Sequence, residues 1–447
     1  MEKPSMSLHF QGRKPSAIRT SQIEFAKRTD SVKAINTAIG NVTLPTHPAM
    51  QERMFNLKSD SSPFKDGVVK YTSTVGQKET NDAFLNVIAA SGFKTDTLYS
   101  QITDGGSQAM ELIILGLCGA AGTDEKPILL IDPAYTNYLS MAKRVGRKSV
   151  SVTRTLQENG KFTLPDMKDI EAVIVDNKPG ALVVIPYDNP TGHYYHQEEM
   201  AALAGLCVKY NMWMVSDEAY RELYYEGDKV TSIWGITDEE VPGIEGRRIS
   251  IETTSKVWNC CGLRIGALIT DNEDFHTKAV AENTANLCSS AIGQYIFGAI
   301  AHESAEDLNK WFEKVRTYYR SMLADFGNEL KSRLPGVIVS SPDSSIYSVI
   351  DVRNIAKPGF NALDFVLYCA KEGKVEVNGQ NYTLLVAPMS GFYSVEKGGV
   401  NPGNTQMRVA YVPVKADMDL APELFEKLFK EYSQKEKSTV GLASKAD

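Results

Sequence analysis

Short apolar runs alternate along the chain with longer segments in which apolar residues recur at helical spacing. A run of four or five β-branched and aliphatic residues predicts a strand that is buried on both faces. Such runs, separated by helical segments, predict an α/β fold with a doubly wound sheet. The predicted strands are residues 128–131, 150–153, 182–186, 213–216, 248–251 and 267–270.

The later part of the chain continues this alternation after a longer helix. Apolar residues at helical spacing, with charges between them, predict one helix over about 305–334 whose aromatic side chains pack in a core. Beyond Pro335 the pattern predicts strands at 345–352, 382–387 and 407–411 and a helix near 363–371. The chain of 447 residues exceeds the roughly 250–300 at which one hydrophobic core stops growing, so two domains are expected. The core positions of the long helix are Trp311, Val315, Tyr318, Met322 and Phe326.

Charge and cysteine usage exclude some classes of protein. The formal net charge of -7 provides no basic face for nucleic acid. No apolar run approaches the roughly 18 residues needed to cross a membrane, and residues 1–10 lack the apolar stretch of a signal peptide. A cytoplasmic protein with no nucleic-acid or membrane partner is therefore expected. Cys260 and Cys261 are the only adjacent pair among six cysteines, and the histidines have no metal-ligand spacing, so reduced thiols and no metal site are predicted.

Three of the predicted strands lead into polar residues with useful chemistry. The strand at 182–186 is followed by Asn189, the strand at 213–216 by Asp217, and the strand at 248–251 by Lys256. In an open parallel sheet, ligands bind outside the carboxyl ends of the strands. We therefore expect these three side chains to lie close together at one edge of the sheet.

The residues around Lys256 match the needs of one cofactor. Thr253 and Ser255 precede this lysine, and Arg264 follows between two glycines. A lysine can form a Schiff base with an aldehyde, and hydroxyls with a forked guanidinium can bind a phosphate ester. With a carboxylate at Asp217 for a pyridine nitrogen, the set fits pyridoxal 5'-phosphate. A Ser-Lys pair before a glycine-rich turn is also common on protein surfaces, so this spacing alone leaves a surface loop open.

Four motifs in order resemble the class I/II pyridoxal-phosphate-dependent aminotransferases, the aspartate aminotransferase superfamily of fold type I. They are Asn-Pro-Thr-Gly at 189–192, Asp-x-x-Tyr at 217–220, Ser-Lys at 255–256 and Gly-x-Arg-x-Gly at 262–266. The resemblance runs from roughly Ala34 to Tyr432. It implies a large cofactor-binding domain at 66–304 with a doubly wound, mixed or mostly parallel sheet, and a smaller α+β domain at 305–447 that residues 1–65 join. The polar residues after Tyr432 predict a disordered tail.

The resemblance implies a role for each residue near the cofactor ring. Lys256 holds the aldehyde at rest and, once displaced, moves the proton of the substrate's α-carbon. Asp217 binds the pyridinium nitrogen, so that the ring stays protonated and accepts electrons. Asn189 and Tyr220 donate to the phenolate oxygen, and Tyr135 stacks on the ring. Taken alone, Asp217 could cap a helix, Asn189 could be a turn residue, and Tyr135 could be a core tyrosine.

Other residues are expected at the phosphate. Arg264 binds it bidentately, with hydroxyls from Ser255 and from Thr253, where the family usually has serine. Tyr71 resembles a tyrosine that reaches the phosphate of the neighbouring subunit, which implies a homodimer; a surface loop tyrosine is the alternative. A glycine-rich turn before the helical run at 110–117 places backbone amides where a dianion is favoured. The residues of this turn that we expect to bind phosphate are Gly106, Ser107 and Gln108.

The substrate is expected to be an amino acid. Arg408 matches the arginine that clamps the substrate's α-carboxylate, although an arginine on an exposed strand edge is the competing interpretation. Gly40 and Asn189 are expected to contact the substrate too. The predicted enzyme moves the amino group of an α-amino acid to a 2-oxo acid by a ping-pong mechanism. A β-lyase of the same fold is the first alternative, and a non-catalytic cofactor-binding regulator the second, although residues 1–33 are too few for an added DNA-binding domain.

Overall fold

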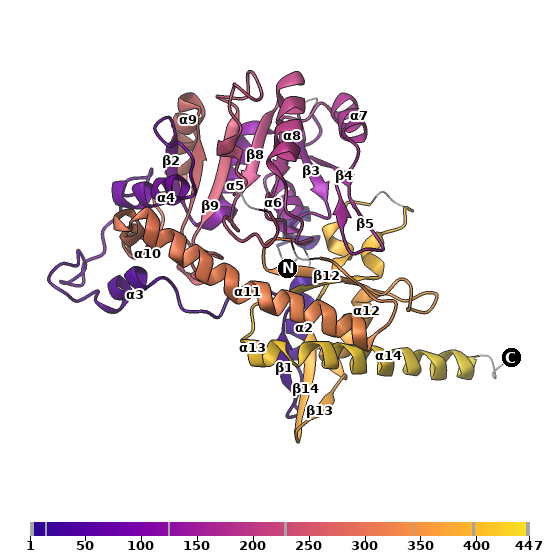
Figure 1. The fold of residues 1–447 in the computed structure, drawn as a ribbon. Coiled ribbons are helices and arrows are strands. Elements are labelled where there is room, and N and C mark those ends of the chain that lie inside the picture. Colours follow the sequence, from indigo (N-terminus) through magenta and orange to yellow (C-terminus); the bar gives the residue numbers. More distant parts are fainter. Residues whose placement is uncertain are drawn as a thin grey trace.

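Figure 1 shows the computed structural model, which describes residues 4–13, 16–123, 126–227, 230–341, 343–395 and 398–443. A body with a large sheet occupies the upper part of the view, and a smaller part with short strands lies below it. The long helix α11 (Ala305–Arg333) passes between the two. Within the described ranges, no helix combines the length and the apolar character that a membrane span requires.

Seven strands form the large sheet, in the order β2-β10-β9-β8-β7-β3-β4. All run in one direction except β10, which is antiparallel to both of its neighbours. The sheet is therefore mixed and mostly parallel, as the sequence predicted. Its strands are β2 (Tyr99–Thr103), β3 (Ile128–Asp132), β4 (Ser149–Thr153), β7 (Ala181–Val184), β8 (Trp213–Asp217), β9 (Arg248–Thr253) and β10 (Gly266–Thr270).

Strand composition explains why the middle of this sheet is a core. Every residue of β3, β7, β9 and β10 is buried, as expected for continuous apolar runs that helices cover on both faces. Among the covering helices, α5 packs against β9 and β10, α8 against β8, and α7 against β4. The helices of the body are α4 (Lys78–Ala90), α5 (Gly105–Leu117), α6 (Asn137–Arg144), α7 (Met167–Asn177), α8 (Gln197–Lys209), α9 (Glu273–Asn283) and α10 (Ala291–Gly298).

Two smaller sheets lie below the body, and they contain strands from the N-terminal and the C-terminal parts of the chain. One is antiparallel, with the order β11-β12-β16-β15. In the other, β1 from the N-terminal segment pairs in parallel with β14, with Lys33 opposite Tyr382, and β13 completes it. These strands are β1 (Lys33–Asn36), β11 (Ile338–Val339), β12 (Tyr347–Asp351), β13 (Val375–Val377), β14 (Gln380–Leu385), β15 (Ala387–Pro388) and β16 (Gln406–Ala410).

The remaining elements are short or terminal. Strands β5 and β6 form a separate two-stranded sheet. Helices α12 and α14 pack on each other and on β14. These elements are β5 (Thr155–Leu156), β6 (Phe162–Thr163), α1 (Leu8–Gln11), α2 (Ala17–Phe25), α3 (Pro48–Phe55), α12 (Ala362–Lys371), α13 (Lys415–Met418) and α14 (Ala421–Ala443).

Helix α11 confirms the long helix predicted over about 305–334. Ser304 caps it, because its hydroxyl oxygen accepts a hydrogen bond from the backbone N–H of Asp307 at 3.1 Å. Four of the five predicted core side chains are buried, whereas Tyr318 is half-buried and its neighbour Tyr319 is buried. The indole N–H of Trp311 donates to the backbone oxygen of Val257 at 3.0 Å. The helix therefore supports the loop that directly follows Lys256.

The structure contains strands that the sequence did not predict, and it divides one that was predicted. Strand β2 was not predicted, and it forms the edge of the large sheet beside β10. The strand predicted over 382–387 is divided between β14 and β15. Helix α14 continues to Ala443, whereas the disorder expected after Tyr432 stays a prediction; residues 444–447 lie outside the described residues. The domain boundaries near residues 65 and 305 stay a prediction.

Candidate active site

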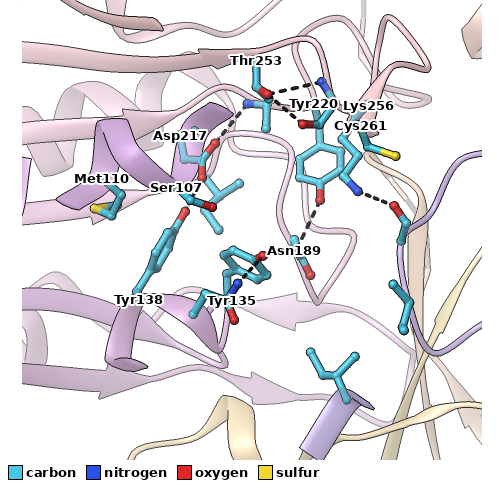
Figure 2. Close-up of a pocket in the computed structure, with 18 of the residues that line it drawn as sticks. Ser107, Met110, Tyr135, Tyr138, Asn189, Asp217, Tyr220, Thr253, Lys256 and Cys261 are labelled. Atoms are coloured by element: carbon cyan, nitrogen blue, oxygen red, sulfur yellow. Dashed lines mark hydrogen bonds between the residues drawn. The ribbon is translucent and has the colours of Figure 1, made fainter. Parts of the chain in front are cut away.

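The carboxyl ends of the parallel strands open into a cavity of about 540 Å³. Strands β2, β3, β7, β8 and β9 point their ends to this edge, and each is followed by residues that line the cavity. Figure 2 shows Asp217, Ser107 and Tyr138 gathered on one side, Tyr220, Lys256 and Cys261 on the other, and Tyr135 between them. The sequence-predicted residues that line the cavity are Gly40, Gly106, Ser107, Tyr135, Asn189, Asp217, Tyr220, Thr253, Ser255, Lys256, Arg264 and Arg408.

Asp217 is the last residue of β8, and its carboxylate is held from two directions. Oδ1 accepts a hydrogen bond from the backbone N–H of Ala219 at 3.1 Å, and Oδ2 accepts one from the hydroxyl of Tyr138 on α6. Burial raises the pKa of Asp217, and these two hydrogen bonds work against that effect. The site therefore holds a desolvated carboxylate that a cation in the cavity would stabilise.

Lys256 lies three residues beyond β9, where its amine reaches the opposite wall. Its Nζ donates a hydrogen bond to the backbone oxygen of Gly40, as Figure 2 shows for Lys256. A Cβ at position 40 would lie 3.0 Å from that Nζ. The absence of a side chain at position 40 therefore leaves room for the amine.

A buried hydrogen-bonded group links the two parts of the molecule. Arg408 on β16 donates through Nη1 to Oδ1 of Asn189 at 2.9 Å and through Nη2 to the backbone oxygen of Ala38 at 2.7 Å. Asn189 in turn donates from Nδ2 to the hydroxyl of Tyr220 at 3.2 Å. Nε of Arg408 is buried and has no hydrogen-bond partner among the described residues. An unsatisfied guanidinium N–H at a cavity wall favours an anionic ligand.

The N-terminus of α5 forms the anion-binding end of the cavity. Gly106 and Ser107 lie in its first turn, where unpaired backbone N–H groups and the helix dipole attract negative charge. The hydroxyls of Thr253 and Ser255 lie 2.8 Å apart across from them. Arg264 adds a guanidinium, which donates to the backbone oxygen of Cys261 at 3.0 Å. This combination of amides, hydroxyls and guanidinium suits a phosphate.

Backbone geometry keeps Arg264 and α5 close together. Arg264 has a φ of 57°, in the left-handed region that costs a non-glycine residue free energy. Gly105 has a φ of 70°, and a Cβ there would lie 2.9 Å from Cζ of Arg264. The strained backbone of Arg264 thus lies where its guanidinium meets the helix.

Tyr135 follows the end of β3, and its hydroxyl accepts a hydrogen bond from Nδ2 of Asn137 at 2.7 Å. Burial raises the pKa of Tyr135 to about 12, so the phenol stays neutral. Arg154 supports the same region: it is buried, and its Nη2 donates to Oδ2 of Asp188 at 2.8 Å and to the backbone oxygen of Pro133 at 3.0 Å. This one guanidinium therefore ties the loop of Tyr135 to the loop of Asn189.

Two predicted residues lie away from the cavity. The side chain of Gln108 turns toward Asn283, to which its Nε2 donates at 3.0 Å, while its Oε1 accepts from the backbone N–H of Asp104 at 2.6 Å. Tyr71 is 80% exposed and lines a separate surface hollow with residues 288–291. In a single chain, neither side chain reaches the residues around Lys256.

The structure also adds residues that the motifs did not indicate. Tyr138 could have been found from its position three residues after Tyr135, because the chain turns between them and their ring centroids lie 5.4 Å apart. Tyr347 gave no such signal, since all of β12 is buried and no alternation marks its inward face. Ile18 and Arg19 of α2 line the cavity too, although no motif marked this helix.

Comparisons with known proteins agree with this geometry. The model of the family "aminotransferase class I and II" matches residues 40–391. The aspartate aminotransferase of Bacillus subtilis is 27% identical over 316 residues, which cover 68% of this chain and 70% of that protein. A solved aspartate aminotransferase from Thermus thermophilus, a single mutant, superposes with a TM-score of 0.77 at 20% identity and covers 95% of this chain and 100% of its own. The N-succinyldiaminopimelate aminotransferase of Mycobacterium tuberculosis gives 0.78 at 18% identity, with the same coverage.

The chain belongs to the class I and II aminotransferase family. This confirms the family, the fold class and the enzyme class that the sequence predicted. The roles of the individual site residues stay predictions.

The raised pKa of Asp217 predicts a stability cost in the cofactor-free protein. A carboxyl group with a raised pKa stabilises the fold only while protonated, and that contribution is lost as the pH rises through its pKa. We therefore expect Asp217→Asn to raise the melting temperature of the cofactor-free protein relative to wild type, and by more at pH 7 than at pH 4. Differential scanning calorimetry at both pH values measures this, with Asp176→Asn on the exposed face of α7 as control. A destabilisation that grows with pH would contradict the assigned environment.

Proposed function

We propose that this protein is a pyridoxal-phosphate-dependent aminotransferase that moves the amino group of an α-amino acid to a 2-oxo acid by a ping-pong mechanism. The observation that carries the proposal is the arrangement of Lys256, Asp217 and the N-terminus of α5 around one cavity, with Arg408 on another wall. These groups suit an aldehyde, a ring nitrogen, a phosphate and a substrate carboxylate. No described group of three or more His, Cys, Asp or Glu residues could hold a metal ion.

The cavity fits pyridoxal 5'-phosphate by the chemistry of its donors. Asp217 would hold the ring nitrogen, Lys256 the aldehyde carbon, and Asn189 with Tyr220 the phenolate oxygen. Tyr135 would stack on the ring. When bound, this group supplies an electron sink for the bond that breaks at the substrate's α-carbon. The residues proposed to hold its phosphate are Gly106, Ser107, Thr253, Ser255 and Arg264.

The protein's own residues position and deprotonate the substrate. Arg408 binds the α-carboxylate through N–H groups that include the unpartnered Nε, and its bond to Asn189 fixes the orientation of the guanidinium. Nζ of Lys256 takes the proton from the substrate's α-carbon. It would then deliver this proton to the aldehyde carbon of the cofactor. Between these steps, the backbone oxygen of Gly40 accepts a hydrogen bond from that amine and keeps it at one wall of the cavity.

A second copy of the chain is the proposed partner. Tyr71 lies on a surface where Val68 is 50%, Val69 56% and Leu287 53% exposed. Apolar side chains in this number at one place favour burial against another protein surface. A homodimer would also bring Tyr71 of one subunit to the other subunit's phosphate-binding residues. The proposed location is the cytoplasm, with no nucleic-acid or membrane partner.

The covalent linkage to Lys256 provides the decisive test of the function. Purified protein should be yellow, catalyse amino-acid-dependent amination of a 2-oxo acid, and become labelled at Lys256 when borohydride is added before digestion and mass spectrometry. Lys256→Ala should lose the label and the transamination. Lys78→Ala, on the exposed start of α4, serves as the control and should keep both. Wild-type turnover by Lys256→Ala would overturn the proposal.

The proposed carboxylate clamp predicts a selective loss of affinity. Arg408→Ala should weaken amino acids and 2-oxo acids alike by about 2–5 kcal/mol, because a buried carboxylate would be left unpaired. Amines without a carboxylate should be affected little. Measured half-reaction dissociation constants check this, and Arg408→Lys should restore only part of the affinity because lysine lacks the fork. An equal loss for simple amines would show that Arg408 is structural.

The proposed dimer predicts complementation between two inactive variants. Tyr71→Ala and Lys256→Ala subunits, mixed under conditions of subunit exchange, should regain activity because one site of the hybrid receives both wild-type residues. Each variant mixed with itself should stay inactive. Absence of recovery, despite exchange measured by mass spectrometry, would place Tyr71 outside the partner's site.

A further inference from the structure

Tyr347 is a buried tyrosine whose hydroxyl lies among the proposed catalytic groups. It is the first residue of β12, and it is 2% exposed while lining the cavity. Its hydroxyl oxygen lies 2.9 Å from that of Tyr220, and the two rings meet edge to face with centroids 5.6 Å apart. The guanidinium of Arg408 stacks on its ring, 4.4 Å from the centroid. The phenol thus touches two residues of the proposed mechanism.

The phenol is also the neighbour of Lys256. A Cβ built on Gly40 would collide with the Tyr347 hydroxyl and lie 3.0 Å from Nζ of Lys256. Both atoms therefore border the small space that the missing side chain at position 40 leaves open. Gly40 has no side chain to separate the amine from the phenol.

We propose that Tyr347 is an acid–base partner of Lys256: its phenol oxygen holds the proton that the amine must lose before it can act as a base. This inference rests on the proposed function, because it concerns the step in which Lys256 takes a proton from the substrate. The exchange is balanced within the pair. Ammonium and phenolate become amine and phenol, and no other reactant is needed.

The hydrogen bond to Tyr220 couples this proton to the rest of the site. The Tyr220 hydroxyl oxygen already accepts from Asn189. When Tyr347 carries its proton, it can donate to the same oxygen, which leaves the Tyr220 proton free to point into the cavity. When Tyr347 is ionised, it can only accept, and the Tyr220 proton turns toward it. The position of one proton therefore sets the direction of the next hydrogen bond.

The charges around Tyr347 favour this role. Burial alone would raise the pKa of Tyr347, but Lys256, Arg408 and the hydrogen bond from Tyr220 outweigh burial, so the pKa lies below its ordinary value. The other titratable groups that face it are Cys261 from the loop after Lys256, Tyr135 after β3 and Tyr319 from α11. In contrast, burial raises the pKa of Tyr411, whose hydroxyl donates to Ser348 at 3.1 Å.

Tyrosine titration tests the inference without any turnover. In the full chain stripped of cofactor, near-ultraviolet absorbance of tyrosinate should show one tyrosine that ionises earlier in wild type than in Tyr347→Phe. Tyr411→Phe is the matched control: it also removes one buried hydroxyl, from the neighbouring strand end, but should keep the early titration. Identical early titration in wild type and Tyr347→Phe would overturn the inference, whether or not the protein is an aminotransferase.

A pH profile of the loaded enzyme separates acid–base chemistry from a structural role. Tyr347→Phe should slow the amino-acid half-reaction by about 10²-fold at neutral pH, the usual worth of one positioned proton-transfer group. The deficit should narrow as pH rises, because Lys256 can then lose its proton to solvent. A deficit of equal size at every pH, or none, would overturn the inference. Wild-type protein that never transaminates would instead reject the proposed function and leave the titration result unaffected.

Discussion

Polar groups at the base of the cavity are removed from water, so each must be satisfied by another polar group or by a ligand. This constraint produces one continuous chain of hydrogen bonds, from Arg408 through Asn189 and Tyr220 to Tyr347. Four separate stretches of sequence supply these residues, and none of the four could move alone without leaving an unpaired group. Among these four residues, the buried Nε of Arg408 is the atom that has no hydrogen-bond partner within the part of the chain that the structure describes. The site is therefore preorganised for its ligand by the same rule that stabilises the core.

The large sheet meets a second requirement of the site, because it brings residues that are distant in sequence to one place. Strands β7, β8 and β9 are adjacent and parallel, so their ends bring Asn189, Asp217 and Lys256 to one edge although the three are far apart in sequence. Helix α5 adds its positive N-terminus at the same edge. The charged groups of the cavity therefore lie at different positions: the carboxylate at the end of β8, the amine beyond β9, and the guanidinium of Arg264 beside the N-terminus of α5.

The sequence predicted those features that depend on local pattern and spacing. Continuous apolar runs identified the central strands, and the motifs with the family resemblance identified twelve residues of the cavity wall. It could not predict Tyr347, because a strand buried on both faces carries no periodicity to show which side chains face a cavity. It could not predict the direction of the Gln108 side chain either, since a residue in the first turn of a helix can point to either side and packing against Asn283 decides. Strand β2 was missed because its edge position depends on pairing with β10, which is distant in sequence.

The pairing of β1 with β14 has a consequence for how the protein is made. Residues 33–36 leave the ribosome early, but their partner strand at 380–385 and Arg408 are synthesised last. The large sheet can complete its order once β10 has emerged, whereas Ala38 gains its partner Arg408 only near the end of translation. A chain that is interrupted after the sheet would thus contain Lys256 and Asp217, yet lack β16 and the wall of the cavity to which Arg408 belongs. Truncation from either end would therefore remove the proposed substrate-binding residues Gly40 or Arg408 before it removes the large sheet.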